Sequence, residues 1–280
     1  KLLEKETLRR GDLEAIFDGE LFSDFLLLYT LCQASRLETR DPDLGPSSCR
    51  LESWRTMAIE TGSRALNLLR DGVAEALRTL GTGFLTHPDN FQLRDDLESG
   101  RVTVYDVNHA LLRVVYRLMF TFVAEDRGAL LDPAAETRSR KRYLDYFATS
   151  RLRATSRRRR GGRYGDRWQA LVLLWQGLGT EGGLPELGLP GIGGLFEPGE
   201  LDFLTECELS NEALLSAVRS LSLVREPKSG VLRHVDYRNL GAEELGSIYE
   251  ALLEFVPHWD SVTKRYSLDV ASGNQRKDTG

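Results

Sequence analysis

The sequence predicts a mainly α-helical fold, a multi-helix domain of orthogonal or bundle-like packing with one small β-hairpin. Apolar residues recur at helical spacing along most of the chain, as expected where each helix buries one face. The alternation of apolar and polar residues that marks half-buried strands is rare. A single stretch, Glu226-Pro227-Lys228-Ser229-Gly230, has turn chemistry between two strand-like segments. These features favour helices around a shared core.

Three helices are expected in the first hundred residues. The first covers residues 12–38 and is followed by a loop rich in Pro and Gly. The second extends from about Leu51 to Leu80, and Gly81-Thr82-Gly83 is expected to end it, because glycine is a poor helix former. The third, shorter helix follows Asn90 and stops at Gly100. All three show apolar residues on one face.

A strongly apolar helix is expected over residues 107–126, with Asp106 as its N-cap. Its side chains leave little polar surface apart from Arg113 and Arg117. A helix that is apolar on nearly every side is usually buried. We therefore expect this helix at the centre of the bundle.

The second half of the chain alternates helices with irregular segments. Helices are expected after Asp132-Pro133, from Asp166 to Gly179, and from a cap at Ser210 to about Leu221. Residues 179–200 are rich in Gly and Pro and predict an ordered but irregular loop. The side chains expected to anchor that loop to the core are Leu187, Leu189, Ile192, Leu195 and Phe196.

The C-terminal part begins with the hairpin, whose strands are expected over Leu221–Arg225 and Val231–Asp236. A helix follows at 242–255, with Asn239 or Gly241 at its start and acidic residues in its first turn. We divide the chain into an N-terminal helical bundle, 1–135, a basic segment plus helical connector with the hairpin, 136–260, and a linker, 261–280.

Composition places the chain among ordinary soluble proteins. Of its 280 residues, 41% are hydrophobic and 28% charged, and no apolar run is long enough to cross a membrane, so no membrane partner is expected. The three cysteines, Cys32, Cys49 and Cys207, are widely spaced and form no CxxC pair. This argues against a zinc site or a disulfide framework and favours a cytoplasmic location.

Charge is distributed unevenly. The net charge is −5, yet basic residues cluster between residues 138 and 167, opposed there only by Asp145 and Asp166. Such asymmetry suggests a polyanion contact on one side of an acidic body. The candidate DNA-binding residues are Arg151, Arg153, Arg157, Arg158, Arg159, Arg160, Arg163 and Arg167. Guanidinium groups bind phosphate oxygens in bidentate fashion, and Gly161 and Gly162 would let backbone approach closely. The competing interpretation is a solvated, partly disordered loop.

Other candidate sites carry little chemistry. Glu125-Asp126-Arg127 is better explained as an ion-paired helix end than as a catalytic dyad. The four histidines are isolated, and no serine lies in a nucleophile elbow. Glu226-Pro227-Lys228 is the nearest match to a restriction-nuclease motif, and its proline in a turn argues against an active site. No catalytic, cofactor-binding or metal-binding residue is therefore expected.

A family resemblance rests on residues 238–255, which read RNLGAEELGSIYEALLEF, and on residues 116–128, which read YRLMFTFVAEDRG. The Arg-rich segment ending at Trp168 and Gly194-Leu195-Phe196 add to it. Together these stretches resemble the helical region that precedes the catalytic domain in large DNA adenine-specific methyltransferases. That group includes single-chain restriction-modification enzymes and the phage-defence methyltransferases of BREX and DISARM type.

The resemblance implies a parent protein that uses S-adenosylmethionine to methylate adenine N6. Its catalytic Pro-Pro-aromatic motif and its Gly-rich cofactor turn are missing here, since the chain has no Pro-Pro pair and Gly191-Ile192-Gly193-Gly194 follows no strand. We therefore expect a non-catalytic fragment, with double-stranded DNA, a methyltransferase domain of the same chain and other defence-system subunits as partners. The alternative is a protein-interaction scaffold without direct DNA contact.

Overall fold

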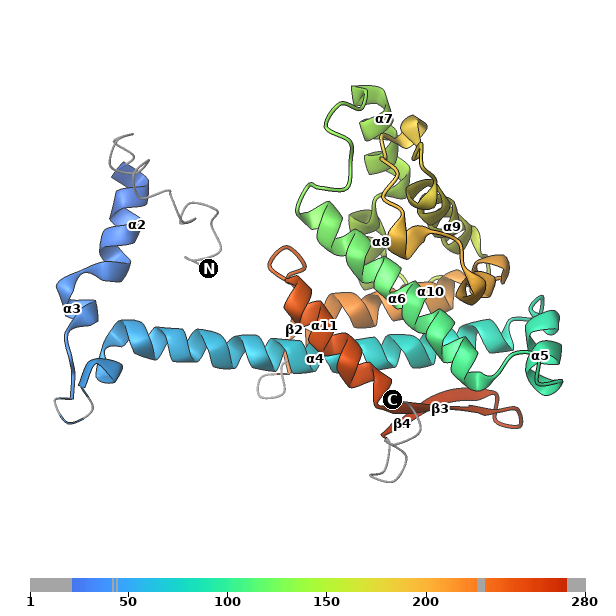
Figure 1. The fold of residues 1–280 in the computed structure, drawn as a ribbon, viewed down its shortest axis with the longest axis horizontal. Helices are drawn as coiled ribbons and strands as arrows, with labels where there is room; N and C mark the ends of the chain where they lie inside the picture. The colour runs from blue at the N-terminus through green and yellow to red at the C-terminus, as the bar shows by residue number, and fades with distance from the viewer. Residues whose placement is uncertain (1–21, 42, 44, 226–229, 271–280) are drawn as a thin grey trace. The chain divides into compact units, whose positions relative to one another are not determined.

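The computed structural model describes residues 22–41, 43, 45–225 and 230–270 (Figure 1). These residues are mainly helical, which confirms the predicted fold class. They also contain two antiparallel two-stranded hairpins, of which the sequence predicts one. The chain divides into two compact units, residues 1–65 and residues 66–280, and each is described by itself.

The first unit contains two short helices, a 3-10 turn and the start of a long helix. These elements are α2 (Phe22–Cys32), α3 (Ala34–Leu37), η2 (Gly45–Ser48) and the first part of α4 (Arg50–Thr86). The helix predicted over 12–38 is interrupted at Gln33, whose backbone is extended, with φ −60° and ψ 152°. Residues 12–21 of that prediction lie outside the described residues. The hydroxyl of Ser48 accepts hydrogen bonds from the backbone N–H groups of Arg40 and Asp41, 3.0 Å each.

Helix α4 does not end at Gly81-Thr82-Gly83, so that prediction is wrong. It continues to Thr86 because these glycines are points of close packing. A Cβ at Gly81 would lie 2.5 Å from the ring of Tyr266, and one at Gly83 would lie 2.6 Å from the Cβ of Ala213. Glycine weakens a helix through its backbone entropy. Glycine is nevertheless required at these two positions of α4, because a larger residue would clash with Tyr266 or Ala213.

The apolar helix of the second unit is α6 (Val104–Asp126), which follows α5 (Phe91–Glu98). Its N-cap is Thr103, not Asp106 as predicted. Thr103 Oγ1 accepts from the N–H of Asp106 at 3.1 Å, and the Asp106 carboxylate accepts from the N–H of Thr103 at 2.8 Å. These bonds form a capping box, and the hydrogen bonds from Thr103 lower the pKa of Asp106.

Helix α6 is long and apolar enough to cross a membrane by length and composition alone, but 67% of its most apolar window is buried inside the protein. Its side chains belong to one cluster of buried residues that extends from Leu69 to Leu268. The cluster includes residues on both sides of the domain boundary that the sequence suggests after residue 135. The central place expected for α6 follows from that packing.

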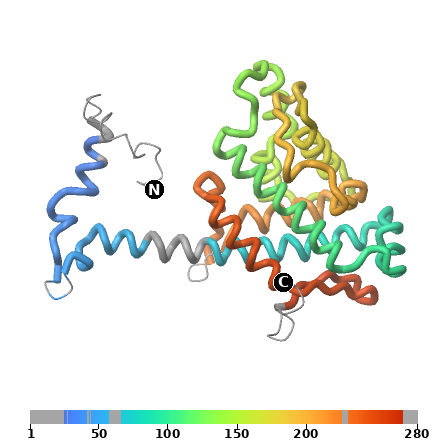
Figure 2. Tube along the Cα trace, viewed as in Figure 1, coloured from blue at the N-terminus to red at the C-terminus, as the bar shows by residue number. Residues whose placement is uncertain are grey.

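Four further helical segments of the second unit pack against α6 or against one another, and their course can be followed in Figure 2. They are α7 (Thr137–Arg142) with the π-helical η3 (Tyr143–Phe147), α8 (Thr149–Arg158), α9 (Asp166–Gly179) and α10 (Asn211–Ser222). Helix α8 contacts both α6 and α10, and α9 contacts α10. The Ser210 hydroxyl caps α10 as predicted.

The irregular loop contains η4 (Pro185–Leu187) and η5 (Gly194–Phe196), and η6 (Glu200–Glu206) follows it. Leu187, Leu189 and Phe196 are buried, whereas Ile192 is 41% exposed and does not anchor the loop. The buried guanidinium of Arg117 donates to the carbonyl of Leu195 at 2.9 Å and pairs with Asp202 at 2.8 Å. The two arginines of α6 thus serve the fold, since Arg113 also pairs with Asp202, at 3.0 Å.

The first hairpin pairs β1 (Leu223–Arg225) with β2 (Leu232–His234), within the predicted strands. Its turn residues 226–229 lie outside the described residues. Helix α11 (Ala242–Leu253) has Gly241 as its N-cap, one of the two starts considered.

The second hairpin pairs β3 (Phe255–Asp260) with β4 (Arg265–Val270), although residues 261–280 were expected to form a linker. Residues 271–280 of that linker lie outside the described residues. The Tyr266 side chain of β4 is buried, and its hydroxyl hydrogen-bonds Asn108 Oδ1 of α6 at 2.8 Å. The strand is therefore part of the core of the second unit.

Candidate nucleic-acid interface

Helix α8 is fixed at its start by Glu125, an acidic residue at the end of α6. The Glu125 carboxylate accepts from the backbone N–H groups of Thr149 and Ser150, at 2.7 and 2.8 Å, and from the hydroxyls of Tyr143 and Thr149, at 2.6 and 2.7 Å. Those N–H groups belong to the first turn of α8, where a carboxylate is favoured. Glu125 is thus the cap of another helix rather than a catalytic group.

Arg153 is buried, with 9% of its surface exposed, although the sequence places it among the DNA-binding candidates. Its guanidinium makes a two-pronged ion pair with the Asp126 carboxylate and lies 5.0 Å from the ring centre of Phe122 and 5.7 Å from that of Tyr237. A guanidinium held in this way is unavailable to a phosphate. Arg153 is therefore removed from the candidate set.

The predicted ion pairing at Glu125-Asp126-Arg127 differs in its partners. Asp126 pairs with Arg153, while Arg127 donates to the carbonyl oxygens of Arg238 and Leu240 at 2.9 and 2.8 Å. The end of α6 thereby joins α8 to the segment before α11. All three side chains are engaged in holding the fold together.

The arginine-rich loop after α8 is held against the start of α10. Arg219 of α10 donates to the carbonyl oxygens of Ser156 and Arg159, at 2.6 and 2.7 Å. In the opposite direction, the N–H of Asn211 donates to the carbonyl of Tyr164 at 2.7 Å, and that of Glu212 to Gly162 at 3.1 Å. The loop satisfies helix N–H groups that would otherwise lack partners. The loop is thus held to α10 by hydrogen bonds both where it leaves α8 and where it approaches α9.

Gly161 explains how the loop comes so close to α10. It has a φ of +91°, and a Cβ there would lie 2.5 Å from the carbonyl oxygen of Asn211. At Gly162, by contrast, a Cβ would meet no atom within 4 Å. The close approach that the sequence suggests for a phosphate is therefore made, at Gly161, to the protein's own backbone.

Four consecutive arginines span the last turn of α8 and the start of this loop. Arg157, Arg158, Arg159 and Arg160 are all exposed. Arg157 Nη1 lies 3.1 Å from His234 Nδ1 of β2, and no side-chain hydrogen bond or ion pair within the described residues engages the other three. Unlike Arg153, the three arginines Arg158, Arg159 and Arg160 keep their guanidinium groups free for an external anion.

The remaining candidates fall on either side of this group. Arg151 is exposed on α8, and Arg163 is exposed with its guanidinium 5.5 Å from the ring centre of Tyr164. Arg167 is half-buried in the first turn of α9. Tyr164 itself is 68% exposed, and the sequence does not single it out because a lone tyrosine next to arginines has no helical or strand pattern to mark it. The candidate interface thus comprises Arg151, Arg157–Arg160, Arg163 and Tyr164, which we call the arginine loop surface.

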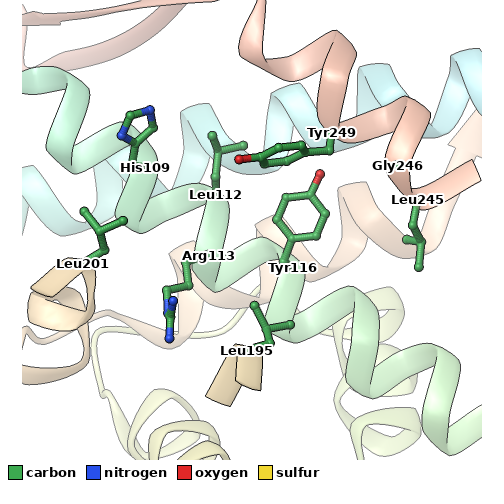
Figure 3. Close-up of a pocket in the computed structure, with 9 residues that line it drawn as sticks. All are labelled: His109, Leu112, Arg113, Tyr116, Leu195, Leu201, Leu245, Gly246 and Tyr249. Atoms are coloured by element: carbon green, nitrogen blue, oxygen red, sulfur yellow. The ribbon is translucent and has the colours of Figure 1, made fainter. Parts of the chain in front are cut away.

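A second feature of the unit is an apolar cavity of ≈ 540 Å³ beside α6, shown in Figure 3. Its lining comes from α6, α11 and the segments near η5 and η6: His109, Leu112, Arg113, Tyr116, Leu195, Leu201, Leu245, Gly246 and Tyr249. The rings of Tyr116 and Tyr249 meet edge to face, with centres 5.1 Å apart. Four of these residues, His109, Leu112, Arg113 and Tyr116, lie on one face of α6. Their helical spacing in the sequence is also that of residues packed in a core. The lining holds no nucleophile paired with a base.

Among the described residues, no group of three or more His, Cys, Asp or Glu side chains could hold a metal ion. No protein-family model, curated protein or solved structure matches the chain. The geometry of the arginine loop surface and of the cavity is therefore the main structural guide to function.

Proposed function

We propose that this chain is the helical, non-catalytic region of a DNA adenine-N6 methyltransferase of the restriction-modification or phage-defence type, and that it holds DNA through the arginine loop surface. The observation that carries the DNA contact is the set of Arg157–Arg160, exposed on a backbone anchored to α10. The methyltransferase assignment rests on the sequence resemblance.

Phosphate is the anion that suits this surface. A guanidinium is planar, remains charged at every physiological pH and offers paired N–H donors that match phosphate oxygens. Each phosphate neutralised on DNA releases condensed counterions, so several arginines together give affinity without sequence preference. In this proposal the surface positions the duplex, and methyl transfer with S-adenosylmethionine belongs to a methyltransferase domain of the parent protein, located in the cytoplasm.

The test is the replacement of Arg157, Arg158, Arg159 and Arg160 together with Ala. Duplex affinity should fall for every sequence alike, and the slope of log affinity against log salt should become shallower by about 0.9 for each phosphate that the variant no longer neutralises. A matched control replaces four other exposed arginines, Arg55, Arg70, Arg101 and Arg265, which changes net charge equally. Fluorescence anisotropy with a labelled duplex over a range of salt concentrations measures both.

A second candidate function is a protein-interaction scaffold, favoured by the apolar cavity, at whose edge Tyr249 is 42% and Leu201 36% exposed. Apolar surface of this kind is common where proteins dock. If the quadruple arginine variant binds duplex as tightly as the unaltered chain and with the same salt slope, the DNA proposal fails and the scaffold takes its place.

A further inference from the structure

We propose that Tyr164 is a stacking platform for an unpaired base, so that the arginine loop surface binds single-stranded DNA more tightly than duplex of the same length. This inference rests on the proposed function, since it assumes that the neighbouring arginines bind phosphates. It goes further by naming the form of DNA that the loop prefers.

The position of Tyr164 is the first reason. Its side chain is 68% exposed, while its carbonyl oxygen accepts the Asn211 N–H of α10 at 2.7 Å. The backbone on either side is also held: Gly162 accepts from Glu212, and Gly165 accepts from Gln169 at 3.0 Å. The ring is therefore presented to solvent from a fixed backbone, which lowers the entropy cost when a flat ligand stacks on it.

The second reason is the charge beside the ring. The Arg163 guanidinium lies 5.5 Å from the ring centre, and Arg157–Arg160 precede it at the last turn of α8 and the start of the loop. Exposed aromatic rings interleaved with arginines are the combination by which proteins hold single strands, because the rings stack on bases and the cations follow the backbone. Of the acidic residues that contact this segment, Asp166 accepts from Asn211 at 2.7 Å and Glu208 accepts from Gln169 at 3.4 Å, while Glu212, whose N–H donates to Gly162, is exposed.

The third reason is that base pairing hides the partner that Tyr164 needs. In a duplex both faces of an interior base are covered by its neighbours, so an exposed ring adds nothing to phosphate binding. In a single strand the faces are accessible, and stacking on an aromatic side chain strengthens binding whatever the base. The ring therefore discriminates between strand forms and not between sequences.

The experiment compares a labelled oligo-dT of about 15 nucleotides with a duplex of equal length, near the upper end of the site size of a single-strand binding module. Replacing Tyr164 with Ala should weaken single-strand binding by about five- to a hundred-fold, from the usual contribution of one stacked base, and leave duplex binding unchanged. Tyr164→Phe keeps the ring and should bind like the unaltered chain. Tyr146→Ala, at a tyrosine that is 77% exposed on η3, is the matched control.

The outcomes separate this inference from the proposed function. If the quadruple arginine variant weakens both DNA forms but Tyr164→Ala leaves single-strand binding intact, the stacking role is overturned and the DNA proposal stands. An equal loss on both forms in Tyr164→Ala also overturns stacking. If the quadruple variant weakens neither form, the DNA proposal itself fails. Photocrosslinking of a 5-iodouracil oligonucleotide to Tyr164, located by mass spectrometry, supports stacking without any variant, and crosslinks confined to other residues count against it.

Discussion

Arg153 and Arg158 lie five positions apart on the same helix, yet they belong to different parts of the molecule. Arg153 is buried against Asp126, Phe122 and Tyr237, while Arg158 is exposed at the last turn of α8. The first joins two helices, and the second is free to meet an external anion. The same residue type in one basic segment thus has two unrelated roles.

This difference shows that the number of arginines in a basic segment overestimates the number that can bind an anion. What decides each role is the face of α8 on which the residue lies and the presence of a carboxylate opposite that face. Burying a charge is costly unless it is paired and hydrogen-bonded. The arginine that faces the core has such a partner, and those that face solvent need none.

The largest effect is expected at the buried arginine. Replacing Arg153 with Ala leaves the Asp126 carboxylate without its partner and should lower the free energy of unfolding by about 3 kcal/mol, the lower end for a broken buried pair because Asp126 is 28% exposed. Urea unfolding measures the loss. The double change Arg153→Met and Asp126→Leu should recover most of it, because no unpaired charge remains. A loss below about 0.5 kcal/mol in Arg153→Ala, the range of surface changes, would contradict the comparison.

An intermediate effect is expected at the glycine that anchors the loop. Gly161→Ala places a side chain on a backbone with positive φ and against Asn211, so it should cost about 1–3 kcal/mol of stability. Duplex affinity should also fall, since the arginines would no longer be held in place. The matched control is Gly162→Ala, where a Cβ has open space. Equal behaviour of the two variants in urea unfolding and anisotropy would show that the anchoring is unimportant.

The smallest effect on stability is expected at a single exposed arginine in the last turn of α8. Arg158→Ala should change the free energy of unfolding by less than about 0.5 kcal/mol, as exposed side chains usually do. Its duplex affinity should nevertheless fall, with a salt slope shallower by about 0.9 if it contacts one phosphate. A clear loss of stability with an unaltered slope would place Arg158 with Arg153 and remove the contrast between them.

Helices with strong apolar periodicity could be predicted from sequence, as α6, α9 and α10 show. Their ends were harder to predict when they depend on distant residues. Gly81 and Gly83 resemble a helix stop, but their role is set by Tyr266 and Ala213, which local sequence does not reveal. Thr103 was overlooked as the cap because Asp106 is also a good cap residue, and only the geometry assigns it to the third position of the helix.

The second hairpin was missed for a similar reason. Alternating Tyr266, Leu268 and Val270 have the period of a strand, but their partner strand contains Pro257, a residue that is rare inside strands, and a charged tail follows them. For the candidate site, the sequence predicts both the exposed arginines and the buried Arg153, because composition carries no information on which face of a helix a residue occupies. Tyr164 was not identified because its importance depends on exposure.

The position of Tyr266 also has a consequence for the order of folding. Its hydroxyl meets Asn108, 158 residues earlier, and its N–H donates to Thr82, 184 residues earlier. Contacts so distant in sequence form slowly, and a chain emerging from the ribosome supplies its N-terminal residues first. The surface of α4 at Gly81, against which the Tyr266 ring packs, therefore stays uncovered until nearly all of the described chain has been synthesised. During that interval the nascent protein exposes core surface that a chaperone could recognise.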